Sequence, residues 1–247
     1  MSRFFNLESL AVLAACLIAC VGGGFAVGLG ALQAVGLGLV LSVVAFLFIA
    51  PAVLDKLVEV YARGPKIGRA LDLAIAARDA APSARIRNRF IVDVALIQLV
   101  RREYQLALEG LEKVKLSLVS SDPAKAVVRG HIAYCLAHLE RDLDRALELA
   151  QGASKAVPDE AIFTYFVGLV LLKQGKPADA EPLLARSIEL DPNPREPFPG
   201  ERFWALAQAR AALGQSVEPA REKAIAAGGV FAEKAQGLGA PSAESVG

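Results

Sequence analysis

The feature that most restricts the fold is a pattern of helix stops that recurs 34 residues apart, as between Pro158 and Pro192. Before Pro192 the chain is apolar at helical spacing over 161–174, is interrupted at Gly175, and then resumes as a second helical pattern. Glycine and proline commonly end helices, so this segment predicts two antiparallel helices joined by a short turn. A single pair of this size cannot bury its apolar face. The recurrence therefore predicts an α-solenoid of stacked helix pairs.

Other copies of the pattern are looser. Tyr134 stands 34 residues before Gly168, so we expect a bulkier helix contact at Tyr134. Residues 88–122 have a longer second helix, and a copy over 202–227 follows a proline-rich break. The spacers are thus unequal, and the superhelix is expected to be irregular.

This pattern resembles the tetratricopeptide repeat (TPR) family, specifically over 161–194, well over 127–160, and partially over 88–122 and 202–227. The resemblance implies an all-α, TPR-like helical repeat domain at residues 55–231. An unrelated helical array is the alternative. Small, polar and glycine-rich residues follow, so residues 232–247 are expected to be a disordered tail.

The N-terminus has a different composition. Residues 9–53 carry no charge, and these 45 residues are about twice the length of one bilayer crossing. A glycine-rich segment at 20–30 marks the expected turn. Residues 1–54 are therefore predicted to form a two-helix transmembrane hairpin, with spans near 7–21 and 30–50.

Small residues recur every four positions in both predicted spans, which places each set on one helix face. Such faces allow close helix contact in lipid. We predict that they pack the hairpin, while self-association into a homo-oligomer and chance spacing remain alternatives. The residues are Ala11, Ala15, Ala19, Gly23, Gly30, Ala34, Gly38 and Ser42.

Basic residues predict the orientation, because they stay on the cytoplasmic side. Arg3 precedes the first span, the turn has no basic residue, and four follow the second span: Lys56, Arg63, Lys66 and Arg69. Both termini are therefore expected in the cytoplasm, at a bacterial inner membrane. Residues 56–102 carry ten basic and four acidic residues, so we also expect contact with anionic lipid head groups. A solvated basic face is the alternative.

Cys20 supports a competing interpretation. The sequence before it, LIAC, resembles a bacterial lipoprotein box, so a cleaved and lipidated chain would be exported for envelope assembly. The second apolar span and the early acidic Glu8 argue against this. Whether Cys20 is lipidated is left open.

The composition argues against several functions. The chain has 27 basic and 26 acidic residues, so no nucleic-acid partner is expected. It has two histidines and no recognised catalytic motif, so we expect no enzyme activity and no cofactor. His131, Cys135 and His138 share one helix face, but the outer two stand about 10 Å apart, too far for one metal ion. No metal site is expected.

The TPR resemblance implies that the first helix of each pair lines a concave surface. That surface is expected to be an apolar groove, with few charges and no basic clamp, for an apolar or helical segment of a protein partner. The partner's identity, and whether the groove is open or filled by the chain itself, are left open. By register the lining residues are Val92, Leu96, Leu99, His131, Cys135, His138, Tyr165, Leu169, Leu172 and Lys173.

The predicted function is therefore a membrane-anchored, non-enzymatic TPR adaptor or scaffold on the cytoplasmic side. An exported lipoprotein-like assembly factor and a self-associating membrane hairpin regulated by the solenoid are the alternatives.

Overall fold

The structure is a computed structural model that describes residues 67–192 and 199–238. It divides into two compact units, Met1–Ile97 and Gln98–Gly247, with helix α4 crossing the boundary. Throughout the described ranges the regular elements are helices and no strand occurs. The predicted all-α class is confirmed for this part of the chain.

The first unit contains α3 (Ile67–Asp79) and most of α4 (Ala84–Val100). Its core joins Ala70 and Ala74 of α3 to Val94 and Ile97 of α4. The two alanines are fully buried. Alanine has the highest helix propensity and leaves room for a neighbouring helix, so this alanine-rich segment forms a closely packed helix pair.

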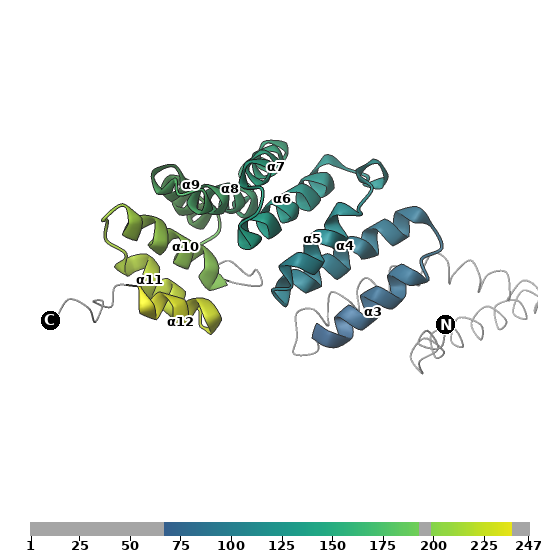
Figure 1. The fold of residues 1–247 in the computed structure, drawn as a ribbon, viewed down its shortest axis with the longest axis horizontal. Coiled ribbons are helices and arrows are strands. Elements are labelled where there is room, and N and C mark those ends of the chain that lie inside the picture. Colours follow the sequence, from purple (N-terminus) through teal and green to yellow (C-terminus); the bar gives the residue numbers. More distant parts are fainter. Residues whose placement is uncertain (1–66, 193–198, 239–247) are drawn as a thin grey trace, which may run out of the picture. The chain divides into compact units, whose positions relative to one another are not determined.

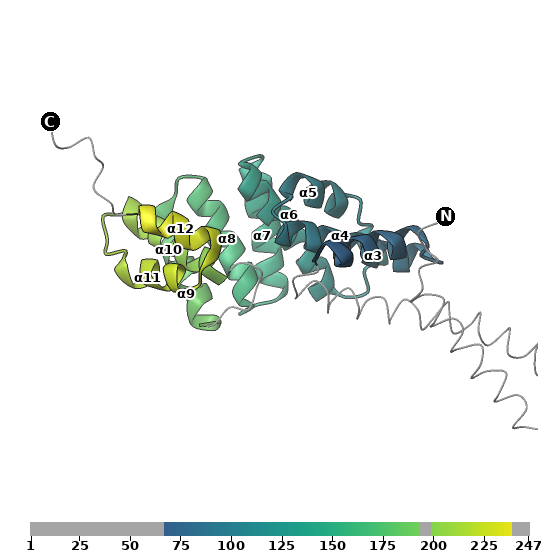
Figure 2. The same cartoon turned by 90° about the horizontal axis from the view of Figure 1, so that it is seen from below.

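The second unit continues with antiparallel helix pairs, α6 with α7, α8 with α9, and α10 with α11 (Figure 1). Turning the view by 90° places α10, α11 and α12 together at one end of this unit (Figure 2). Its elements are α5 (Tyr104–Glu112), the 3₁₀ turn η1 (Leu116–Leu118), α6 (Asp122–Leu139), α7 (Leu143–Ala156), α8 (Ala161–Lys173), α9 (Pro177–Leu190), α10 (Pro199–Ala212), α11 (Glu218–Ala226) and α12 (Gly229–Gly237).

The helix ends follow local chemistry. Ser121 caps α6 by accepting a hydrogen bond from the Ala124 N–H at 3.3 Å. Gly175 has a φ of +72°, which allows the tight turn between α8 and α9 that the sequence predicts. The equivalent turn between α6 and α7 has Glu140 and Asp142 at φ of 51° and 44° instead. Left-handed turns are therefore made here without glycine, by a glutamate, which rarely adopts this conformation, and by an aspartate, which adopts it more often.

Close packing within a pair is clearest between α8 and α9. A Cβ atom at Gly168 would lie 2.9 Å from Cγ and Cδ2 of Leu184, which is itself fully buried. Gly130 of α6 is similarly close to Phe163 and Phe166 of α8. The glycines thus let large side chains of adjacent helices fill the space between them.

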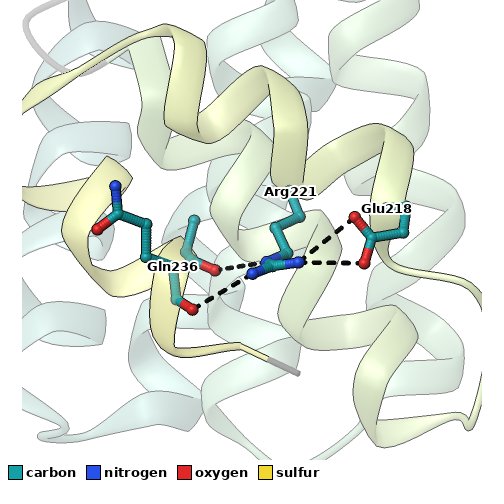
Figure 3. Close-up of polar contacts among 4 residues, drawn as sticks. Glu218, Arg221 and Gln236 are labelled. Carbon is teal, nitrogen blue, oxygen red and sulfur yellow. Dashed lines mark hydrogen bonds and ion pairs between the residues drawn. The ribbon is translucent and has the colours of Figure 1, made fainter. Parts of the chain in front are cut away.

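Helix α12 corrects the predicted end of the folded domain. The helix continues to Gly237, and Ala232 and Ala235 within it are buried, so residues 232–237 are not part of a tail. Arg221 of α11 holds the last turn, donating to the carbonyl oxygens of Ala235 at 3.0 Å and Gln236 at 3.4 Å (Figure 3). It also pairs with Glu218 at 3.1 Å (Figure 3). A cation at a helix C-terminus stabilises exposed carbonyl groups.

Residues 1–66, which include the predicted hairpin, lie outside the described residues, as do 239–247. Among the helices that the structure does describe, none is long and apolar enough to cross a bilayer.

Candidate functional site

A buried polar cluster joins the first helices of three pairs in the second unit. We call it the Glu201 cluster. Its members come from the start of α5, from α6 and α8, and from the first turn of α10, and they are Tyr104, Tyr134, His138, Tyr165, Glu201 and Arg202.

The Glu201 carboxylate is the centre of the cluster and is only 2% exposed. Its Oε2 accepts a hydrogen bond of 2.7 Å from the Tyr134 hydroxyl. Its Oε1 lies 2.7 Å from His138 Nε2, an ion-pair distance without a well-aligned hydrogen bond. Tyr134 and His138 are four residues apart on α6, so one helix face contacts both oxygens. We call the Tyr134 and His138 groups, with the neighbouring Tyr165 hydroxyl, the carboxylate seat.

Aromatic contacts hold the imidazole of His138 in place. The Tyr104 ring stacks on it with a centroid distance of 4.2 Å and an interplanar angle of 3°. The Tyr134 ring meets it edge-on at 4.4 Å. His138 also lies in the last turn of α6, where the helix dipole favours a positive charge. The imidazole is therefore positioned to face a carboxylate.

Arg202, the neighbour of Glu201, is directed toward different helices. Its guanidinium is buried, donates to the Ser187 carbonyl oxygen of α9 at 3.2 Å, and lies 3.7 Å from an Asp191 carboxylate oxygen. It is also 5.8 Å from the centroid of the Tyr165 ring. Because buried charges need such partners, the first turn of α10 is tied both to α6 and to α9.

The phenols of the cluster stay protonated. Burial, followed by the charge of Glu201, raises the pKa of Tyr134 and of Tyr165 well above the usual value. The same two causes raise the pKa of Tyr104 to about 12. A protonated phenol donates a hydrogen bond, so at neutral pH these groups suit a negatively charged oxygen.

The predicted groove residues are divided between the two units and differ in exposure. Val92 and Leu96 lie in the first unit, and the other eight lie in the second. The buried members are Leu99, Cys135, Tyr165 and Leu169, and the half-buried members are Val92, Leu96, His131, His138, Leu172 and Lys173. That these residues bind a partner stays a prediction. In this arrangement of the helices, only the half-buried residues are accessible to a partner.

The residues considered as metal ligands have separate surroundings. His131 Nδ1 is 2.7 Å from the Val127 carbonyl oxygen, and burial lowers the pKa of this histidine. Cys135 is fully buried, and its burial raises the thiol pKa to about 12. His138 faces Glu201. Within 67–192 and 199–238, no three histidine, cysteine or acidic side chains are grouped to hold a metal ion.

Most of the residues predicted to contact the membrane lie outside the part of the chain that the structure describes. All eight small residues of the hairpin, together with Lys56, Arg63 and Lys66, lie outside the described residues. Arg69 is described, and its side chain is exposed on α3. Head-group contact stays a prediction.

Sequence analysis missed Glu201 and Arg202. The signal available was a charged pair placed directly before Phe203 and Trp204, between a proline-rich break and an apolar helix. The second signal was Tyr134, which replaces the small residue found at Gly168. Neither signal reveals that the two positions meet.

Several solved structures resemble this chain. Nearly identical TPR-like repeats of kinesin light chain type from Podospora anserina match with a TM-score of 0.50 and 15% identity, covering 76% of this chain and 93% of that one. MamA from Desulfovibrio magneticus RS-1 matches with a TM-score of 0.49 and 16% identity over 76% and 94% of the two chains. YrrB, described as a TPR protein with an unusual peptide-binding site, gives 0.46 and 18% over 73% and 89%.

No family model and no curated protein matches the chain. At this level of identity, the likeness to the Podospora repeats shows the fold alone.

Proposed function

We propose that this TPR-like helical repeat protein is a non-enzymatic adaptor, which binds a protein partner while residues 1–54 hold it at a bacterial inner membrane. The observation that carries the proposal is the stacking of helix pairs from α6 to α11. Stacked pairs of this kind present an extended surface made by successive repeats, which suits a peptide or helix. Three half-buried groove residues of the second unit, His131, Leu172 and Lys173, lie outside the Glu201 cluster and are assigned to that contact.

The proposed anchor rests on the 45 uncharged residues at 9–53 and on the basic residues that follow them. An anchored adaptor meets membrane-bound partners at a raised effective concentration. Exposed arginines of the first unit, Arg69, Arg85 and Arg87, support the further proposal that this unit contacts anionic head groups.

Partner capture tests the adaptor function. Full-length chain, extracted in mild detergent, is compared with Leu172→Asp, which alters a half-buried groove residue at the end of α8. Leu106→Asp is the matched control, because Leu106 is 50% exposed on α5, outside the predicted groove. We expect Leu172→Asp to lose partners that Leu106→Asp retains. Identical partner sets for all three chains would contradict the proposed groove.

Membrane topology is tested separately. Protease added to inside-out vesicles should digest the helical domain, and protease added to intact spheroplasts should not. The reverse pattern, together with palmitate incorporation that depends on Cys20, would favour the exported lipoprotein instead.

A further inference from the structure

The carboxylate seat is built to recognise one negatively charged group. Tyr134 and His138 lie one helical turn apart on α6. The Tyr134 hydroxyl donates to one oxygen of Glu201, and His138 Nε2 lies at ion-pair distance from the other, each at 2.7 Å. The Tyr165 hydroxyl is buried beside them, without a well-aligned hydrogen-bond partner among the residues that the structure describes. The Tyr165 ring lies 6.5 Å from the Tyr134 ring, centroid to centroid. Burial, followed by the charge of Glu201, raises the pKa of Tyr165, so its hydroxyl stays protonated and is available as an additional donor.

Helix packing alone does not explain this arrangement. At the equivalent position of the next pair, Gly168 meets the apolar Leu184 side chain, which fills the space without burying a charge. Burying a carboxylate is strongly unfavourable unless its partners compensate. The groups that contact the carboxylate, Tyr134 and His138, both lie on α6, and only the carboxylate comes from α10.

The remainder of α10 is held independently of the seat. It packs against α9, α11 and α12, where Phe203 contributes to a core with Ala224 and Ala235. Arg202 is fastened to α9 by its bond to the Ser187 carbonyl oxygen. Withdrawal of Glu201 from the seat would therefore disturb the first turn of α10 and leave its main packing in place.

We propose that the carboxylate seat is a recognition site for a glutamate or aspartate in the first helical turn of a partner segment, and that Glu201 occupies it in the free chain as an internal competitor. The expected partner resembles the start of α10, an acidic residue and an arginine followed by aromatic and apolar residues. This inference rests on the proposed adaptor function and names the chemistry that its surface selects.

The test uses a labelled synthetic peptide with the sequence of residues 199–212 as the probe. A second peptide carries glutamine at the position of Glu201. Each is titrated into the purified full-length chain in detergent, as wild type and as Glu201→Ala, and binding is followed by fluorescence anisotropy. Glu201→Gln keeps the side-chain size and serves as the second variant if Glu201→Ala is misfolded by circular dichroism.

We expect Glu201→Ala to bind the glutamate peptide at least about tenfold more tightly than wild type does, because the internal competitor is gone. The glutamine peptide should show no such gain, and adding Tyr134→Phe to Glu201→Ala should abolish it. Equal binding of both peptides by the variant, equal binding of the glutamate peptide by variant and wild type, or no binding by a folded variant would each overturn the inference.

The two proposals fail separately. Carboxylate-dependent peptide binding together with unchanged partner capture by Leu172→Asp would retain the seat and contradict the groove. Loss of partners by Leu172→Asp, without carboxylate-dependent peptide binding, would retain the adaptor and contradict the seat.

Discussion

Gly168 and Tyr134 occupy equivalent positions, 34 residues apart, and they make opposite kinds of contact. Gly168 in α8 leaves space that Leu184 of the adjacent helix fills with apolar atoms. Tyr134 in α6 extends a hydroxyl to the carboxylate of Glu201, 67 residues away. The same repeat position thus serves local packing in one pair and a long-range polar contact in the other.

The difference shows where a repeat protein carries information beyond its scaffold. A position that follows the repeat pattern is explained by its own helix pair. A position that departs from it, as Tyr134 does, has to be explained by something outside the pair. In this chain that partner is the first turn of α10.

Truncating the apolar contact between Gly168 and Leu184 should lower the stability of the protein more than removing the polar contact of Tyr134. Leu184→Ala removes a fully buried side chain beside Gly168, and we expect it to lower the free energy of unfolding by about 3 kcal/mol. Urea unfolding in mild detergent, followed by circular dichroism, measures this. The exposed Leu106→Ala should cost less than about 0.5 kcal/mol. Equal losses for the two would mean that the α8–α9 contact does not contribute as described.

Removing the hydroxyl oxygen of Tyr134 should also lower the stability, because it breaks the hydrogen bond to Glu201. Tyr134→Phe leaves the carboxylate with one donor fewer, and we expect a loss of about 2 kcal/mol, as for hydrogen bonds to charged groups. In a Glu201→Gln background the same substitution should cost clearly less, because the charge is absent. A double-mutant cycle with no coupling between the two sites would refute the buried contact.

Gly168→Ala should cost about 1 kcal/mol. Overpacking against Leu184 costs about 1–3 kcal/mol, and the higher helix propensity of alanine offsets up to about 1 kcal/mol. Gly152→Ala in α7 is the matched control, since a Cβ atom there meets nothing within 4 Å and should stabilise the protein. Adding Gly168→Ala to Leu184→Ala should remove most of the penalty, because the truncated side chain leaves room for the methyl group and only the Leu184 backbone nitrogen, at 3.3 Å, stays close.

The smallest effect is expected at an exposed ion pair that joins the end of α8 to the residue that follows α6. Lys173 at the end of α8 is 2.7 Å from Glu140 and lowers its pKa by a hydrogen bond and by charge attraction. A depressed pKa stabilises the fold above the unfolded-state pKa of about 4.3, and this contribution disappears as the pH falls through the lower folded-state pKa.

Lys173→Met should therefore return the Glu140 pKa toward its usual value, as measured by NMR titration. In acid, the stability of the Lys173→Met variant should become equal to that of wild type. Lys155→Met, on the exposed face of α7, should leave the Glu140 pKa unchanged. A Glu140 pKa that does not respond to Lys173→Met would contradict the ion pair.

Much of the helical organisation was predictable from local signals. The structure has the predicted turn at Gly175 between α8 and α9, and α9 ends before Pro192 as predicted. The predicted pair over 202–227 corresponds to α10 and α11. The left-handed turn at Glu140 was not predictable as such, because no glycine marks it. Helix α12 was missed because it is short and glycine-flanked, and its stability comes from Arg221 and from packing rather than from its own composition.

The candidate site was predictable only in part. His138 and Tyr165 were identified by register as lining residues, and both belong to the Glu201 cluster. The register placed them on the first helices of their pairs but assigned them no common partner. Glu201 belongs to a different pair, and no periodic pattern relates it to Tyr134.

The sequence by itself determined the helices, their pairing and the 34-residue interval, because helix propensity, capping and turn chemistry act over a few residues. Only the tertiary structure decided that a carboxylate from α10 is held by α6. That contact depends on the path the chain follows through the intervening helices, and each small angle between successive pairs contributes to where Glu201 arrives.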